Sequence, residues 1–224
     1  MEVTVKVEAV SKKAKVIALL KETILSGLMK PGEPIVESRM AQQFGVGVGL
    51  VREALLELEH QGFVQRTPFS STQVTTFDRK DAQQIFDIRI LLEPLACQLA
   101  GQNANKDQLS ELRDIAARAR QGIDNEDLTV FFEHQLAFRQ KIWEMSGNEH
   151  LHQILERLVI PLYALYLIRE SSNRKGLLQV AREGAEHQRK ILRNLEAGRF
   201  DAAGQLTADF LIKMKANLGT KLLP

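Results

Sequence analysis

The sequence has few of the features that mark secreted or membrane proteins. It contains one cysteine, Cys97, which excludes a disulfide framework and a multi-cysteine zinc module and suits a reducing cytoplasm. Its longest apolar run covers the 11 residues 158–168 and is interrupted by Pro161, whereas a membrane span needs about 20 residues. The N-terminal stretch MEVTVKVEAVSKKAK lacks the apolar core of a signal peptide. We therefore expect a cytoplasmic protein with no membrane partner.

The sequence also has little net charge. Its 30 basic and 28 acidic residues give a formal charge of +2, so bulk electrostatics alone does not indicate a nucleic-acid binder. With 44% hydrophobic and 26% charged residues, the composition is that of an ordinary globular protein. A chain of 224 residues can bury a sizeable core as one large domain or two small ones.

Glycine and proline are unevenly distributed, and their distribution divides the chain in two. Residues 11–77 contain Gly27, Gly32, Gly45, Gly47, Gly49, Gly62, Pro31, Pro34 and Pro68. After Asp78 the apolar residues follow long helical periodicities with few breaks, and Asp78 itself suits a helix N-cap. We therefore expect one domain over residues 11–77 and a second over residues 78–220.

The first domain is predicted to contain three short helices followed by a two-stranded wing. Helical apolar spacing covers residues 13–26, 37–44 and 49–60, and Gly45 and Val46 form the turn between the second and third helices. Residues 63–66 and 73–76 favour β-strands on either side of a turn at 67–70. This order of elements is typical of a winged helix-turn-helix.

The second domain is predicted to be entirely helical. Helical patterns cover residues 81–101, a segment starting near 105, and residues 127–145, 151–170, 177–196 and 201–218. Long helices joined by short links predict an antiparallel helical bundle. The fold class is therefore mainly α, a winged helix-turn-helix followed by an all-α bundle.

Several stretches resemble a known family. In the first domain they are ILSGLMKPGE (24–33), MAQQFGV (40–46), VREAL (51–55) and GFV (62–64), which are similar to GntR-type winged-helix regulators. In the second domain the pieces LEPLA (92–96), SGN (146–148), Glu186-His187 and GRFD (198–201) resemble the FCD subfamily, whose effector domain is all-helical. The resemblance implies a homodimeric transcription factor that responds to a ligand.

The third helix of the first domain would enter the major groove of double-stranded DNA. The resemblance places Val48 where relatives keep an arginine that contacts a base, while Arg52 corresponds to their second DNA-contacting arginine. The candidate DNA-binding residues are Arg52, Arg39, Ser38, Gly47, Gly49, Arg66, Lys12 and Lys13. Basic side chains among them would hold phosphates, and the glycine amides would approach a phosphate closely. A solvated lysine face is the alternative interpretation of the basic charge.

The second domain departs from the metal-binding pattern that many FCD domains have. The positions that resemble the metal ligands hold Gln135, Arg139, His187 and Asp209. Arginine has no lone pair to offer a metal, so we expect no metal and no cofactor there. Arg139 would instead pair with Asp209, or bind a carboxylate or phosphate effector bidentately. Arg89, from another helix, would converge on the same pocket or serve as a dimer or interdomain contact.

The function expected from these features is a ligand-responsive, DNA-binding transcriptional regulator with a small organic acid as its effector. The alternative is a helical ligand-binding or protein-interaction module whose DNA-binding head is weakened, because Gly47, Val48, Gly49 and Leu50 replace polar residues. An enzyme is not expected, because the sequence has no phosphate-binding glycine loop, nucleophile elbow or metalloenzyme signature.

Overall fold

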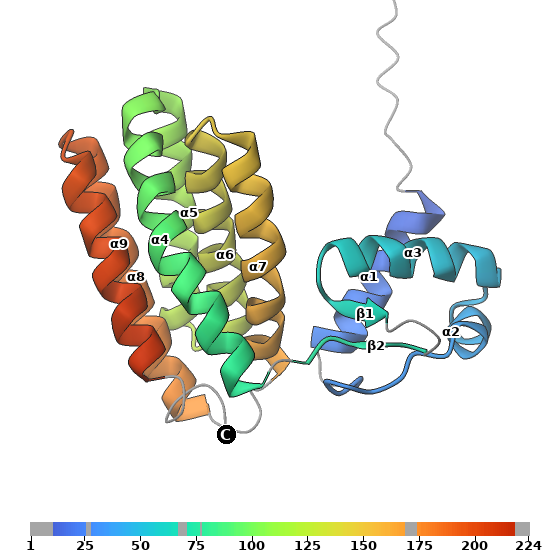
Figure 1. Ribbon diagram of the computed structural model, residues 1–224. Coiled ribbons are helices and arrows are strands. Elements are labelled where there is room, and N and C mark those ends of the chain that lie inside the picture. The colour runs from blue at the N-terminus through green and yellow to red at the C-terminus, as the bar shows by residue number, and fades with distance from the viewer. Residues whose placement is uncertain (1–10, 26–27, 67–70, 77, 169–173, 218–224) are drawn as a thin grey trace, which may run out of the picture. The chain divides into compact units, whose positions relative to one another are not determined.

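The computed structural model describes residues 11–25, 28–66, 71–76, 78–168 and 174–217 (Figure 1). The chain separates into two compact units, Met1–Thr75 and Thr76–Pro224, and each is considered by itself. The first unit contains α1 (Lys12–Leu25), α2 (Glu37–Phe44), α3 (Val48–His60), β1 (Val64–Arg66) and β2 (Thr72–Val74). The predicted winged helix-turn-helix is confirmed.

The core of the first unit holds α3 in place. Val51, Leu55 and Leu58 lie on one face of α3 and are fully buried, and α1 contributes the buried Leu20 and Ile24. An α-helix has about 3.6 residues per turn, so only one face of α3 packs on this core and the opposite face is exposed to solvent. The core therefore determines which side chains of α3 can meet a ligand.

A tight turn joins α2 to α3. Gly45 has a φ of +64°, a left-handed conformation that favours glycine, and the N–H of Val46 donates to the carbonyl of Ala41 over 3.0 Å. Gly47 then returns to an extended conformation immediately before the first residue of α3. The linker of Gly45, Val46 and Gly47 therefore ends α2 and lets α3 begin in a different direction.

The wing is a two-stranded antiparallel sheet. Val64 pairs with Val74, and Arg66 pairs with Thr72. The segment before α2 adds an isolated bridge between Pro34 and Gln73, which ties the start of α2 to the wing. The predicted turn at residues 67–70 lies outside the described residues.

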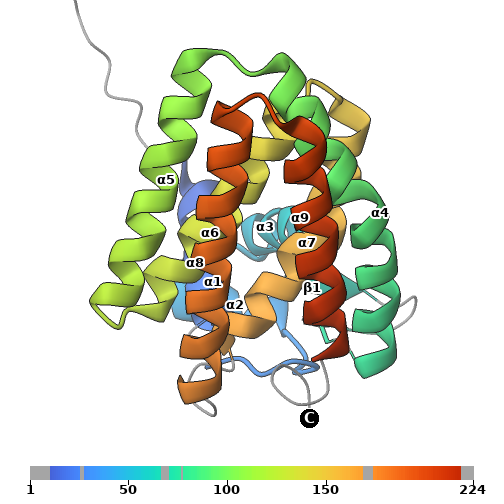
Figure 2. The same ribbon diagram turned by 90° about the vertical axis from the view of Figure 1, so that its left-hand side faces the viewer.

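The second unit contains α4 (Arg79–Asn103), α5 (Lys106–Asp124), α6 (Leu128–Met145), α7 (Glu149–Ile168), α8 (Arg174–Glu196) and α9 (Phe200–Ala216). Figure 2 shows α8 and α9 side by side, with α5 flanking α8 and α4 flanking α9, and α6 packs against α8. Capping boxes begin two of these helices: Asp78 with Asp81 starts α4, and Asn105 with Gln108 starts α5. The predicted antiparallel bundle is confirmed.

The bundle core is dominated by aromatic side chains of α6. Phe131, Phe132, Phe138 and Trp143 are all buried, and Phe86 of α4 joins them. Within this apolar core the helices also bury charged side chains, namely Arg89, Glu93 and Arg139. Buried charges are costly unless they are paired, so this part of the core is a candidate functional site.

Candidate functional site

The exposed first turn of α3 carries no polar side chain. Gly47, Val48 and Gly49 are all exposed, and Val48 keeps 40% of its surface accessible. Leu50 is partly buried, and Val51 is fully buried in the core. Val48 is therefore the side chain that this turn presents to solvent.

Two candidate arginines meet on one carboxylate beside α3. Arg52 donates from Nε to Oε2 of Glu37 over 3.0 Å and from Nη2 to the same oxygen over 2.9 Å. Nη2 of Arg66 lies 3.8 Å from Oε1 of Glu37, and its Nε lies 3.7 Å from Oε2 of Glu59. The hydrogen bonds that Arg52 donates to Glu37 raise the pKa of Arg52, whose side chain nevertheless stays 59% exposed. Glu37 thus fixes the direction of a guanidinium that solvent can still reach.

An open hollow of about 480 Å³ lies next to this ion pair. Its lining residues are Ile35, Val36, Glu37, Ser38, Val48, Arg66, Ser71 and Thr72. The start of α2, the start of α3 and the wing therefore surround one space, which brings Ser38, Val48 and Arg66 together. Sequence reasoning missed Glu37, although an acidic residue at the start of α2 was a visible signal of a partner for Arg52.

The other predicted DNA-binding residues do not line this hollow. Arg39 is exposed on α2, and the two glycines at 47 and 49 lie on the backbone beside Val48. Lys12 is exposed in the first turn of α1, and Lys13 is partly buried there. These side chains flank the central group and are not joined to it by the contacts described above.

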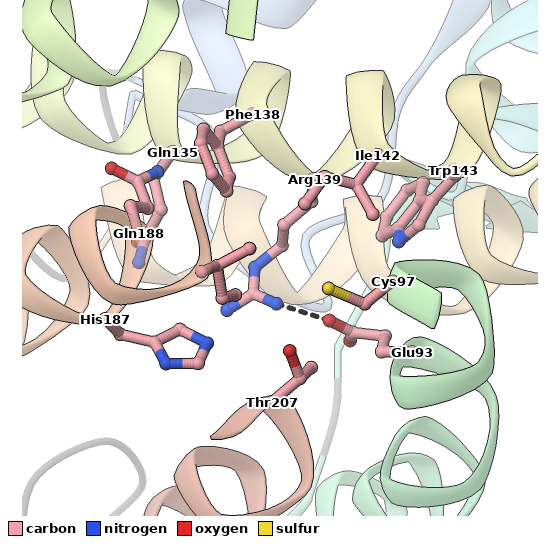
Figure 3. Close-up of a pocket in the computed structure, with 11 residues that line it drawn as sticks. Glu93, Cys97, Gln135, Phe138, Arg139, Ile142, Trp143, His187, Gln188 and Thr207 are labelled. Atoms are coloured by element: carbon pink, nitrogen blue, oxygen red, sulfur yellow. Dashed lines mark hydrogen bonds and ion pairs between the residues drawn. The ribbon is translucent and has the colours of Figure 1, made fainter. Parts of the chain in front are cut away.

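In the second unit, two guanidiniums converge on one buried carboxylate (Figure 3 shows the Arg139 side). Arg89 donates from Nε to Oε1 of Glu93 over 2.6 Å, and Arg139 donates from Nη1 to Oε2 of Glu93. The exposed fraction of the side chain is 3% for Arg89, 3% for Glu93 and 10% for Arg139. Burial raises the pKa of Glu93, but the charges and hydrogen bonds of the two arginines outweigh it and hold that pKa below its usual value.

The predicted Arg139–Asp209 ion pair is wrong. Asp209 is exposed on α9 and accepts a hydrogen bond from Gln205 over 2.9 Å. Successive residues of a helix turn by about 100°, so residues 207 and 209 point in widely different directions. The core-facing position belongs to Thr207, which is buried and lines the pocket with Glu93 and Arg139.

Two small cavities share Gln135 and Arg139 as lining residues. The first is lined by Glu93, Cys97, Gln135, Phe138, Arg139, Ile142, Trp143, His187, Gln188, Ile191 and Thr207. The second is lined by Phe86, Arg89, Gln135, Arg139, Phe210, Leu211 and Met214. Each leaves about 20 Å³ for the centre of a water molecule, which is room for about one water.

Glycine brings α8 close to α6 beside the first cavity. A Cβ at Gly184 of α8 would lie 2.3 Å from the side-chain nitrogen of Gln135 and 3.2 Å from the ring of Phe131. The absence of a side chain at this position lets Gln135 occupy the space between the two helices. The wall of the cavity is therefore shaped by a small residue on one helix and an amide on the other.

The first cavity contains buried polar atoms that have no hydrogen-bond partner within the described residues. They are Nε2 of His187 and both side-chain polar atoms of Gln188. The imidazole of His187 stacks on Phe210 at 4.1 Å between ring centres. Burial first, and then the charges of Arg139 and Lys190, lower the pKa of His187 to about 3, so the ring is neutral at neutral pH. Unsatisfied buried polar groups are uncommon, and they mark this cavity as a candidate ligand site.

Comparison with known proteins assigns each of the two units to a known family of domains. Residues 12–74 match the bacterial regulatory proteins of the gntR family, and residues 84–212 match the FCD domain. The chain belongs to the GntR family and carries an FCD domain. Proteins of this family are transcriptional regulators rather than enzymes.

Individual relatives include regulators from two model bacteria. The chain is 33% identical to the uncharacterized HTH-type transcriptional regulator YdhC of Bacillus subtilis, over 62% of either chain. It is 28% identical to the HTH-type transcriptional regulator McbR of Escherichia coli, over 80% of this chain and 79% of McbR.

Solved structures have the same fold. E. coli McbR/YncC superposes with a TM-score of 0.76 at 25% identity, covering 94% of this chain and 98% of that one. A GntR regulator from Rhodococcus sp. RHA1 gives a TM-score of 0.75 at 18% identity, covering 93% of this chain and 98% of that one, and supports the fold alone.

The FCD pocket of this GntR-family chain does not fit a metal ion. The described residues contain no group of three or more His, Cys, Asp or Glu side chains that could hold one. Arg139 offers no lone pair, and burial raises the pKa of the neighbouring Cys97 thiol to about 12, which keeps it protonated. The pocket instead presents Arg139, paired with the ionised carboxylate of Glu93, together with neutral hydrogen-bonding groups.

Across the described part of the chain, no helix combines the length and apolarity that crossing a membrane would require.

Proposed function

We propose that this protein is a ligand-responsive transcriptional regulator that binds double-stranded DNA as a homodimer. Residues 11–77 would bind the duplex, and residues 78–220 would bind a small-molecule effector. The observation that carries the proposal is the exposed guanidinium of Arg52, held by Glu37 beside the solvent-exposed face of α3. The names of the relatives, which are HTH-type transcriptional regulators, support the same function.

The DNA contacts proposed here divide into two groups. Arg52 and Arg66, oriented by Glu37, approach the duplex together with Ser38 and the backbone of Gly47 and Gly49. Arg39, Lys12 and Lys13 add sequence-independent contacts with phosphates from the flanks. Binding that depends on phosphate contacts falls steeply as the salt concentration rises.

Selection of bound sequences from a random DNA pool tests the proposed function directly. We expect a palindromic site to be enriched, and Arg52→Ala to weaken binding to it at least tenfold, about 1.4 kcal/mol. Arg113→Ala is a matched control, because Arg113 is an equally exposed arginine that pairs with Glu196 in the other unit. Equal affinity of the wild type and Arg52→Ala would remove Arg52 from the interface.

The proposed effector is a small organic acid that binds at Arg139. Two guanidiniums share the single carboxylate of Glu93, and the neighbouring His187 and Gln188 side chains retain unused hydrogen-bonding capacity. A carboxylate ligand would match the bidentate geometry of a guanidinium and the hydrogen-bonding groups around it. Because the cavities have room for only about one water each, binding requires the lining side chains to move. An effector would therefore favour one conformation of the bundle over another.

Thermal unfolding with a panel of small carboxylates tests the effector site. An acid that binds raises the melting temperature of the wild type, and Arg139→Ala abolishes this shift, whereas Arg113→Ala retains it. Arg139→Lys keeps the charge but loses the bidentate geometry, so we expect it to reduce the shift. Neutral amides that raise the melting temperature as strongly as the acids would contradict the proposed carboxylate.

One observation favours a second candidate function, a ligand-binding module with a weakened DNA-binding head. The first turn of α3, residues 48–51, contains no side-chain hydrogen-bond donor or acceptor with which to read a base edge. If the random-pool selection enriched no sequence even at low salt, this second function would be favoured.

A further inference from the structure

The recognition surface of α3 is apolar at the point where base contacts are expected. A recognition helix contacts base edges with residues of its N-terminal turns. Here that turn presents Val48, which is 40% exposed. Exposure of a valine side chain to water is unfavourable, and covering the side chain with an apolar surface lowers the free energy. The question is which group covers Val48 when the helix lies in a groove.

Val48 stands beside the basic groups that would bring the duplex to it. Val48 and Arg52 are four residues apart on α3, so they share one face of the helix. Val48 also lines the hollow beside α3, together with Ser38 and Arg66. A duplex held through Arg52 therefore meets Val48 at the same time.

Val48 lies between two glycines, Gly47 and Gly49, so the residues on either side of it have no side chain. A Cβ added at Gly47 or Gly49 would meet nothing within 4 Å, and Gly47 has an ordinary φ of −73°. The fold therefore does not require glycine at either position. Their effect is to remove side chains on both sides of Val48, so that a group as large as a base edge can reach its methyl groups.

In the major groove, the 5-methyl group of thymine is the apolar feature of the base edges. We propose that Val48 reads thymine by packing its methyl groups against that 5-methyl group. The inference rests on the DNA-binding function proposed above and names the base pair that the altered turn selects. Val48 would thus replace hydrogen-bond readout by apolar contact.

Replacing thymine by deoxyuridine tests this contact, because it removes the methyl group and leaves the Watson–Crick edge intact. In the site selected from the random pool, each thymine is replaced singly, and affinities are measured by fluorescence anisotropy. We expect one position in each half-site to lose about fourfold in affinity, the effect of one methyl group removed from an apolar contact.

The variant Val48→Ala completes a double-mutant cycle with that position. We expect Val48→Ala to bind thymine and deoxyuridine with equal affinity there, which assigns the methyl contact to Val48. Leu56→Ala is the matched control, because Leu56 is an equally exposed apolar residue farther along α3. This control should retain the fourfold preference for thymine.

The outcomes separate this inference from the proposed function. A selected site at which no deoxyuridine weakens binding, or at which Val48→Ala keeps the full thymine preference, overturns the role of Val48 while DNA binding stands. A selection that enriches no sequence overturns both. Because Val48 is exposed, Val48→Ala is expected to unfold at the wild-type temperature, which excludes misfolding as the cause of a changed preference.

Discussion

Glu93 is the residue on which the charged part of the bundle core depends. Its two oxygens accept from different arginines, one on its own helix and one on α6. The guanidinium of Arg89 also lies 4.5 Å from the ring centre of Phe86, so its flat face is covered as well. A single carboxylate is therefore a shared partner of two buried cations.

We predict that Glu93→Gln destabilises the protein by about 3–5 kcal/mol, because it removes a buried carboxylate that two buried guanidiniums share. Urea unfolding measures this loss. Glu196→Gln is the comparison, since Glu196 pairs with the exposed Arg113 and such surface pairs contribute about 0–1 kcal/mol. Equal losses for the two variants would show that the buried carboxylate is not structurally important.

His187 makes stability depend on pH. Its pKa in the folded protein is lowered to about 3, first by burial and then by the charges of Arg139 and Lys190. The unfolded chain binds a proton near the ordinary value of 6.5, so the unfolded state binds more protons between these values and stability falls as pH falls. The largest possible slope is about 1.4 kcal/mol per pH unit.

We predict that His187→Gln flattens this slope between about pH 6.5 and 5, measured by urea unfolding at several pH values. Glu93 acts with the same sign, because its pKa is also lowered, but only below its ordinary value of 4.5. The measurement therefore stops at about pH 5. A slope that is the same in the variant and the wild type would assign the pH dependence to other groups.

At the scale of the elements, the contact between α4 and α9 depends on a missing side chain. A Cβ at Gly101 of α4 would lie 2.2 Å from the ring of Phe200, the first residue of α9. Gly49 of α3 is also helical, but a Cβ there would meet nothing within 4 Å. The two helical glycines therefore differ in what an added methyl group would meet.

We predict that Gly101→Ala destabilises the bundle by about 1–3 kcal/mol, because the added methyl group forces the ring of Phe200 to move. Gly49→Ala should be neutral or stabilising by up to about 1 kcal/mol, because alanine favours a helix more than glycine does. Thermal unfolding compares the two variants. A Gly101→Ala protein as stable as Gly49→Ala would show that α4 and α9 separate without cost.

Helical periodicity predicted the elements more accurately than their ends. The helix expected over 81–101 runs over Arg79–Asn103, because the cap at Asp78 starts the helix at the very next residue. The strands expected at 63–66 and 73–76 are Val64–Arg66 and Thr72–Val74. Strand propensity indicates where β-structure forms, but the pairing of Arg66 with Thr72 sets the register.

The site residues were only partly predictable, because ion pairs between helices depend on packing. The geometry brings Arg89 and Arg139 to one site, yet their shared partner is Glu93 and not Asp209. The spacing of Arg89 and Glu93, four residues apart on one helix, was the available signal. No spacing along the chain relates Arg139 of α6 to Glu93 of α4, which are 46 residues apart.

At the scale of the whole molecule, α4 joins three features. It is the first helix after the boundary between the two units, and it carries Arg89 and Glu93 on its buried face. Its outer face exposes Ile88, Leu91 and Leu95, which recur at helical spacing and form an apolar stripe. The buried charged residues and the outer apolar stripe therefore lie on different faces of one helix.

We predict that this stripe is the contact of the proposed homodimer, because Leu91 is 74% exposed and lies in the middle of it. Leu91→Glu should convert the dimer to a monomer in sedimentation equilibrium and weaken binding to a palindromic site, since each head would then bind its half-site alone. Ile154→Glu on α7 is the control, because Ile154 is an exposed apolar residue that is not part of this stripe. If Leu91→Glu remained dimeric while it bound the palindrome as tightly as the wild type, the two heads would have to be joined through another face of the bundle.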